Sequence, residues 1–183
     1  QECIDSILDS DYSNFKVIIV DNGSKDNSLE LLERLYDSND KVIILKNNKN
    51  LGYSKGMNVG LDYSFNNLEA DFCLVMNNDT FLDKQAISAL VEVAQKDEKI
   101  GFVTGKVYYA DNPDIFQTIG KFSEAGLLNI RYRGKGVIDK GQYDKDCELD
   151  FCDDIYWLIS KDLYQITGGY DPEFFLEAED FDW

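Results

Sequence analysis

Short apolar runs alternate with amphipathic segments along the first two-thirds of this chain, and the alternation limits the folds open to it. Three runs have the composition of strands buried on both faces: FKVIIV at 15–20, KVIILK at 41–46 and DFCLVMN at 71–77. Segments predicted as helices lie at 2–9, 26–36, 54–66 and 83–96. Strands that alternate with helices predict an α/β fold, with a mostly parallel sheet and helices on both of its faces.

Two of the predicted helices carry further signals. In 26–36, Asn27 followed by Glu30 indicates an N-terminal cap. In 83–96, spacings of three and four place one set of apolar residues on a single face: Ile87, Leu90, Val91 and Ala94.

The pattern changes after residue 100. The run at 100–109 (IGFVTGKVYY) predicts one longer strand, and IYWLIS at 155–160 predicts another. Residues 120–147 are rich in glycine and charge and lack periodicity, so we expect a mobile loop or an irregular hairpin there. GGYDP at 168–172 indicates a tight turn. We therefore expect one domain, with a regular first half followed by an irregular one.

Composition excludes several classes of function. The net charge of −17 argues against a nucleic-acid-binding protein, which would normally carry a basic face. The chain has no histidine, which removes Ser-His-Asp and Cys-His catalysis; a general base would have to be a carboxylate, a lysine, a tyrosine or a cysteine. Its four cysteines form no C-x-x-C pair, so a zinc site is not expected; Cys73, inside an apolar strand, is expected to be a core residue.

The two ends of the sequence suggest an excerpt. The chain begins at Gln1 rather than at an initiator methionine, and residues 2–9 have the pattern of a helix already under way. We therefore expect the fold to be truncated at both ends.

Polar clusters follow two of the predicted strands. Asp21-Asn22-Gly23-Ser24 follows 15–20, and Asn77-Asn78-Asp79 ends 71–77. These residue types also dominate ordinary turns, but two clusters at equivalent strand ends favour a site, because open parallel sheets bind ligands there. Asp21 could accept hydrogen bonds from a nucleobase or ribose, and Asp79 could bind a hard divalent cation.

A glycine-rich stretch lies between these clusters. NLGYSKGMNVG at 50–60 matches neither the dinucleotide fingerprint nor the P-loop. It predicts a loop that enters a helix with close backbone approach. Lys55 could reach a phosphate from there, although a solvated lysine is the simpler interpretation.

Four segments taken in order resemble family 2 inverting glycosyltransferases of the GT-A fold: VIIVDNGSKDNS, NKNLGYSKGMNVG, VMNNDT and GGYDPEFFLEAEDFDW. The similarity runs from the first predicted strand to the last residue and looks closest to the bacterial rhamnosyltransferase-like branch of polysaccharide synthesis. It implies a Rossmann-like nucleotide-diphospho-sugar transferase fold. Residues 1–99 would form the nucleotide-sugar-binding half and 100–183 the acceptor-side half of one catalytic domain. The family's usual first strand is absent, and DDIYW at 153–157 replaces its common small Gly-Ala pair.

The resemblance also implies roles for individual residues. Asp21 would contact the nucleotide base, Asp79 would bind Mn²⁺ or Mg²⁺, and Asp180 or Glu179 would be the catalytic base. The remaining residues implied to bind the sugar donor are Asn22, Ser24, Asn50, Gly52, Lys55, Asn58, Asn77 and Asn78.

The implied reaction transfers a sugar from a UDP- or dTDP-sugar to a saccharide or a lipid-linked saccharide. It would take place in the cytoplasm, with peripheral association at the inner face of the plasma membrane. Two alternatives stay open at this point. One is a sugar-nucleotide pyrophosphorylase, which would release pyrophosphate. The other is an inactive nucleotide-sugar-binding module within a larger protein.

Overall fold

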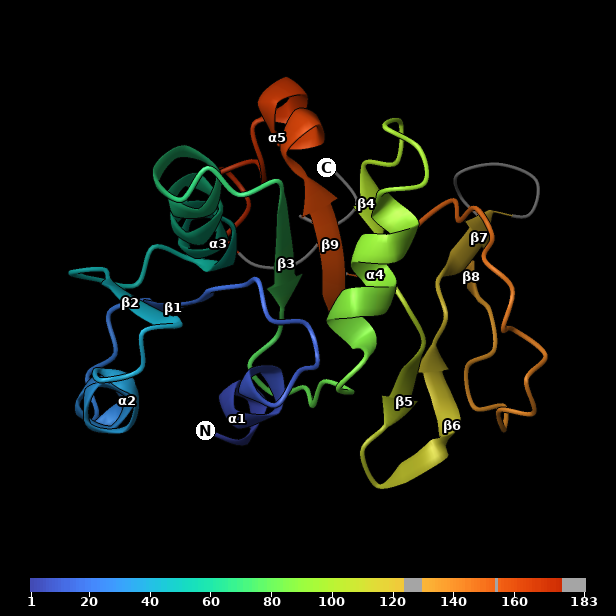
Figure 1. Ribbon diagram of the computed structural model, residues 1–183, viewed down its shortest axis with the longest axis horizontal. Helices are drawn as coiled ribbons and strands as arrows, with labels where there is room; N and C mark the ends of the chain where they lie inside the picture. Colours follow the sequence, from blue (N-terminus) through green and yellow to red (C-terminus); the bar gives the residue numbers. More distant parts are fainter. Residues whose placement is uncertain (124–129, 154, 176–183) are drawn as a thin grey trace.

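The computed structural model describes residues 1–123, 130–153 and 155–175, and these fold as an α/β structure (Figure 1). Its helices are α1 (Glu2–Leu8), α2 (Ser28–Tyr36), α3 (Tyr53–Asp62), α4 (Ala86–Ala94) and α5 (Lys161–Thr167). A π-helical turn, Tyr63–Asn67, continues α3, so the predicted helix at 54–66 is confirmed with a change of pitch near its end.

Four strands of five residues match the predicted apolar runs. They are β1 (Val17–Asp21), β2 (Val42–Lys46), β3 (Phe72–Met76) and β9 (Tyr156–Ser160). The other strands are β4 (Phe102–Val103), β5 (Val107–Tyr109), β6 (Asn112–Thr118), β7 (Lys121–Ser123) and β8 (Ile130–Tyr132); each has two or three residues except β6, which has seven.

The sheet is less parallel than the alternation predicted. β1 and β2 pair in parallel, with Val17 opposite Val42 and Asp21 opposite Lys46. β9 lies between β3 and β4 and is antiparallel to both (Figure 1). Among the described residues the parallel ladder is therefore confined to β1 and β2. The reason is that β9 enters the sheet from the later, irregular part of the chain and runs in the opposite direction to β3 and β4.

The long strand predicted at 100–109 is wrong, because the structure divides it into β4 and β5. The break contains Gly105, where a Cβ atom would overlap the hydroxyl of Tyr156. Thr104 donates from its hydroxyl to the main-chain oxygen of Tyr156 at 2.7 Å, which fixes the chain beside β9. The backbone therefore bends where it passes the Tyr156 side chain.

β9 supplies both hydrophobic cores by simple strand alternation. Trp157 and Ile159 face a cluster that also contains Leu61, Phe65, Val75 and Tyr170. Leu158, on the opposite face, packs against the predicted face of α4, namely Ile87, Leu90, Val91 and Ala94, together with Val103. Each fully buried side chain of this size contributes roughly 1.5–3 kcal/mol, so β9 joins the two parts of the chain in one packed unit.

One predicted cap is only partly confirmed, and one helix was missed. Asn27 occupies the N-cap position of α2, but its side chain makes no cap hydrogen bond; instead the Asp26 carboxylate accepts from the Ser28 amide at 3.0 Å. α5 was not predicted, and it begins at a genuine cap in which the Ser160 hydroxyl accepts from the Leu163 amide at 3.3 Å. The irregular hairpin expected within 120–147 is present as β7 and β8.

Candidate functional site

Asp21 closes β1 as a buried carboxylate, with 7% of its surface exposed. Its Oδ2 accepts from the Ser24 amide at 3.3 Å, and its main-chain oxygen accepts from the Asn47 amide at 2.9 Å. Gly23 has φ +78°, and a Cβ there would lie 2.5 Å from the Lys49 carbonyl carbon. The turn after β1 is therefore pressed against the loop that follows β2, and only glycine fits at its bend.

Both the nitrogen and the oxygen of the Asn22 side-chain amide form hydrogen bonds to that loop. Its Nδ2 donates to Asn50 Oδ1 at 3.2 Å and to the Gly52 carbonyl at 2.9 Å. Its Oδ1 accepts from Asn47 Nδ2 and from the Leu51 amide, both at 3.1 Å. Since an amide offers two donors and two lone pairs, these four bonds use its full capacity. Asn22 therefore shapes the loop at 47–52 and has no hydrogen-bonding capacity left for a ligand in this conformation.

The loop it holds contains two more of the predicted residues. Asn50 is exposed, and its Oδ1 also accepts from the Gly52 amide at 2.8 Å. Gly52 has φ +87° and precedes the first residue of α3. Ser24 and Lys55 are both exposed. The structure thus brings Asn22, Asn50 and Gly52 together at the start of α3.

The second polar cluster forms the turn after β3. The Asn77 amide donates to the Ile155 carbonyl at 2.9 Å, and the Asn77 carbonyl accepts from the Thr80 hydroxyl at 2.5 Å. Its side-chain Oδ1 accepts from the Tyr53 hydroxyl at 3.3 Å. Asn78 and Asp79 are exposed. Tyr53 therefore links the start of α3 directly to this turn.

α1 lies beneath the same turn. The Cys3 thiol contacts the Asn77 carbonyl at 3.7 Å, and burial raises the pKa of that thiol, so it stays protonated. The Leu82 amide donates to the Ser6 hydroxyl at 3.0 Å. The turn that presents Asp79 is thus supported from both sides.

The residues after β3 suit a hard divalent cation only in part. Asp79 offers an exposed carboxylate beside the amide oxygen of Asn78, and oxygen ligands of this kind are those that Mg²⁺ and Mn²⁺ prefer. Within the described ranges, however, no three acidic, cysteine or histidine side chains come together. A cation here would therefore need phosphate oxygens and water to complete its coordination.

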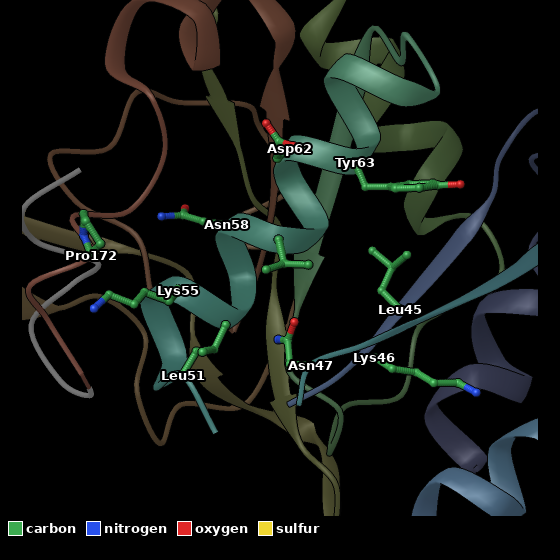
Figure 2. Close-up of a pocket in the computed structure, with 10 residues that line it drawn as sticks. Leu45, Lys46, Asn47, Leu51, Lys55, Asn58, Asp62, Tyr63 and Pro172 are labelled. Carbon is green, nitrogen blue, oxygen red and sulfur yellow. The ribbon is translucent and has the colours of Figure 1, made fainter. Parts of the chain in front are cut away.

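A hollow of about 680 Å³ lies beside this region, between the end of β2 and α3 (Figure 2). Lys55 and Asn58 line it and project from α3 toward the segment that carries Pro172. Its other lining residues are Leu45, Lys46, Asn47, Leu51, Val59, Asp62, Tyr63 and Pro172. Asp21, Asn77 and Asp79 are not among them. The hollow meets the first polar turn through Asn47 and Leu51, which bond to Asn22.

Asn58 is engaged inside the protein. Its Nδ2 donates to the Tyr170 carbonyl at 2.7 Å, and its Oδ1 accepts from the Tyr170 amide at 3.0 Å. The side chain therefore holds the turn after α5.

The later part of the chain contributes charged clusters. The Lys121 ammonium pairs with Asp153, and the two side chains are only 4% and 14% exposed. Lys106 contacts Asp139 and Asp144. Burial alone would lower the pKa of Lys106, but its hydrogen bonds to those two carboxylates outweigh burial and raise it.

Several basic side chains between β7 and residue 147 lie over aromatic rings. The Arg133 guanidinium lies 4.8 Å from the Phe122 ring centre and 5.1 Å from that of Tyr143. Lys135 lies 4.5 Å from the ring centre of Tyr132. These contacts fold the segment onto its own hairpin.

The predicted catalytic pair, Glu179 and Asp180, lies outside the described residues. Sequence reasoning missed three residues that the structure makes prominent: Tyr53, Lys121 and Asp153. An aromatic residue directly after Gly52 was the available signal for the first. The Lys121–Asp153 pair is long-range and left no local pattern.

The chain matches known proteins along nearly its whole length. A family model described as glycosyl transferase family 2 matches residues 1–166. The poly-β-1,6-N-acetyl-D-glucosamine synthase of Staphylococcus aureus (strain COL) is 26% identical over 183 residues, which is all of this chain and 41% of that protein. The synthase of the same name from Staphylococcus epidermidis is 21% identical over 184 residues and is also covered to 41%. The chain thus spans less than half the length of these relatives.

A solved structure shows the same fold. The crystal structure of S. aureus TarS in complex with UDP superposes with a TM-score of 0.60 at 19% identity, covering 98% of this chain and 48% of that one. This likeness and the family match confirm the expected GT-A α/β fold. The rhamnosyltransferase-like branch stays a prediction. None of the helices in the described ranges has the length and apolar character needed to cross a bilayer.

Proposed function

The chain belongs to glycosyl transferase family 2, and on that premise we propose that it carries the catalytic region of an inverting glycosyltransferase of bacterial polysaccharide synthesis. One observation carries the proposal. Two polar turns, Asp21–Ser24 and Asn77–Asp79, follow β1 and β3, and α3 reaches both through the loop at 47–52 and the Tyr53 hydroxyl. Open α/β sheets bind their ligands just beyond the carboxyl ends of the strands, which is where these two turns lie.

The sugar donor is a nucleoside-diphosphate sugar of the UDP or dTDP type. Asp21 is proposed to receive hydrogen bonds from the base or ribose, with Ser24 and Asn50 beside it. Lys55, exposed on α3, supplies a cation for the diphosphate. Asn77 and Asn78 are proposed to face the diphosphate and the sugar. UDP in the TarS structure supports a uridine nucleotide, and the names of the relatives support a saccharide polymer as acceptor or product.

In the proposed reaction an acceptor hydroxyl attacks the anomeric carbon from the face opposite the diphosphate. The new C–O bond forms as the bond from that carbon to the phosphate oxygen breaks, so the configuration inverts. The hydroxyl proton passes to a carboxylate, Asp180 or Glu179, since the chain has no histidine. A Mn²⁺ or Mg²⁺ ion bound at Asp79 would offset charge on the departing nucleoside diphosphate.

The cellular setting follows from this substrate class. We propose a cytoplasmic location with peripheral association at the inner membrane face, where lipid-linked saccharide acceptors lie. Nucleic acid is not a partner, since the net charge is −17.

Thermal unfolding with a panel of nucleotide sugars tests the proposal. A ligand that binds only the native state raises its apparent stability, so one UDP- or dTDP-sugar should raise Tm in Mn²⁺ and less in EDTA. Asp79→Ala should remove this dependence on the metal, whereas Asp83→Ala, in the same loop, should keep it. The effective sugar, mixed with saccharide acceptors, should yield nucleoside diphosphate. Release of pyrophosphate from a nucleoside triphosphate and a sugar phosphate would contradict the proposal, as would binding without any transfer.

A further inference from the structure

The turn after α5 is held on α3 by the side chain of Asn58. The amide of Asn58 makes two bonds to Tyr170, one to its carbonyl and one to its N–H, at 2.7 and 3.0 Å. The Tyr170 ring is 1% exposed in the first core and meets Tyr53 edge-to-face at 5.9 Å. A backbone group paired in both directions at a buried residue has a fixed position.

Gly169 is fitted closely to the same amide. Its φ is +91°, and a Cβ there would lie 2.7 Å from Asn58 Oδ1. The preceding Gly168 has nearly the same backbone angle, φ +83°, but a Cβ there would meet nothing within 4 Å. The two glycines therefore share a positive φ, but only at Gly169 would a Cβ press on Asn58, with the Tyr164 ring 3.3 Å away on the same position.

A second contact fixes the chain beyond this turn. The carbonyl of Phe175 accepts from the Tyr53 amide at 2.7 Å, at the first residue of α3. The Phe175 ring lies against Gly52, where a Cβ would come within 2.7 Å of ring carbon Cδ2. Gly52 is also the residue that Asn22 and Asn50 hold. The loop at 47–52 and the segment 169–175 therefore meet at the N-terminal end of α3.

We propose that Asn58 is a positioning residue for catalysis rather than a ligand of the sugar donor. The Asn58–Tyr170 and Tyr53–Phe175 contacts, which together form the latch, hold residues 170–175 against α3, immediately before the acid-rich stretch 177–182 in the sequence. This inference rests on the proposed function, in which a carboxylate of that stretch removes the acceptor's proton. A base held loosely still lets the nucleotide sugar bind but reaches the hydroxyl proton less often.

Asn58→Ala should lower kcat by about 10²-fold, the loss that a misplacement of about 1 Å can cause, while KM and Kd for the nucleotide sugar stay unchanged. The matched control is Asn66→Ala, because Asn66 is exposed and bonds to Asp62, one turn earlier. Asn58→Asp keeps the acceptor for the Tyr170 amide and should recover part of kcat. A role confined to stability would instead reduce the amount of folded enzyme and leave the kcat of that fraction intact.

The two glycines give an independent test. Gly168→Ala and Gly169→Ala impose the same left-handed strain, but only Gly169→Ala displaces Asn58, so only it should lower kcat strongly. In the double variant Asn58→Ala/Gly169→Ala the two losses should not add, because both break one contact.

Amide hydrogen exchange separates failure of the latch from failure of the proposed function. Exchange at 168–175 should quicken in Asn58→Ala and Gly169→Ala but not in Gly168→Ala. Unchanged exchange would overturn the latch whatever the activity. Full kcat in folded Asn58→Ala, or a weakened Kd that accounts for its whole loss, would overturn the positioning role. A wild-type protein that binds nucleotide sugar but transfers no sugar would contradict the proposed function. Hydrogen exchange does not depend on transfer, so it would still test the latch in that case.

Discussion

The two halves of the chain are stabilised by different interactions. In residues 1–99 the strands are five residues long, the turns are held by amide hydrogen bonds around Asn22, and the ion pairs, such as Lys84–Asp9, are exposed. In the described part of 100–183, β4, β5, β7 and β8 have two or three residues each, and Lys121–Asp153 is nearly buried. Six glycines there have positive φ: Gly120, Gly134, Gly136, Gly141, Gly168 and Gly169.

The difference shows how each half is encoded. Apolar periodicity is sufficient for regular strands and helices, because every such residue packs against the same layer. Short strands bury too little to hold themselves, so the later half depends on particular charge pairs, cation–π contacts and glycine bends. Two strands of this half are longer: β6 has seven residues and pairs with β5, and β9 lies at the centre of the three-stranded sheet β3-β9-β4 (Figure 1).

The largest effect is expected from removing the proposed general base, which lies in the later half of the sequence. Asp180→Asn keeps the side-chain shape and removes its basicity, so kcat should fall by roughly 10²–10⁴-fold, the usual contribution of a general base. Binding of the nucleotide sugar, assigned to the first half, should stay near normal. Steady-state kinetics of Asp180→Asn beside Glu179→Gln decides between the two carboxylates. Retained turnover in both would place the base elsewhere and break the division of roles.

The next largest effect is expected on stability, from breaking the buried ion pair between Lys121 and Asp153. Lys121→Met leaves the Asp153 carboxylate without its cation in a poorly solvated position, which should cost about 3–5 kcal/mol in the free energy of unfolding. Lys121→Met/Asp153→Leu should recover most of that loss, because no charge then remains buried.

Lys84→Met in the first half is the control for this pair. Its partner Asp9 is exposed, so the unfolding midpoint should not move. Urea unfolding of the three variants measures the contrast. Equal stability for Lys121→Met and Lys84→Met would show that the two halves do not differ in this way.

A smaller effect concerns helix caps. Ser160→Ala removes the acceptor for the Leu163 amide at the start of α5 and should cost about 1 kcal/mol in the free energy of unfolding. Asn27→Ala, at the equivalent position of α2, removes no cap hydrogen bond and should cost much less. If thermal or urea unfolding ranked Asn27→Ala as the more damaging change, the cap assigned to α5 would be wrong.

The smallest expected effect is a change in stability with pH that depends on Asp139. The Tyr108 hydroxyl, the Gly141 amide and Lys106 hold the pKa of Asp139 at about 2, below its usual 3.8. The ionised carboxylate therefore stabilises the fold above pH 3.8, and the contribution disappears as pH falls through about 2.

Asp139→Asn, which cannot ionise, tests that pH dependence. The wild type should be more stable than Asp139→Asn at neutral pH, and the gap should close between pH 4 and 2, as measured by urea midpoints at a series of pH values. A gap that stayed constant over this range would contradict the lowered pKa.

Sequence reasoning predicted the first half well because its signals are local. The runs at 15–20, 41–46 and 71–77 are β1, β2 and β3, and the α4 face was named residue by residue. The antiparallel orientation of β9 was not predictable, since the apolar composition of IYWLIS identifies a buried strand but does not specify its direction relative to its neighbours. The break at Gly105 depends on Tyr156, which lies far along the chain.

The residues of the candidate site occupy two kinds of position in the structure. Asp21, Asn77 and Asp79 stand at strand ends as expected. The resemblance implied that Asn22 and Asn58 bind the sugar donor, but in the structure their amides bond to the protein backbone and to neighbouring amides. The hydrogen-bond partners of an amide depend on which residues the fold brings near it, and a local sequence pattern does not contain that information.

The anomeric configuration of the product tests the central claim most directly. The nucleotide sugar that most raises Tm is incubated with the protein and a saccharide acceptor, and the anomeric proton is followed by NMR during turnover. Inverting transfer predicts one nucleoside diphosphate released for each new glycosidic bond, with the configuration opposite to that of the sugar donor. A product with retained configuration, or diphosphate release without a new glycosidic bond, would contradict the account.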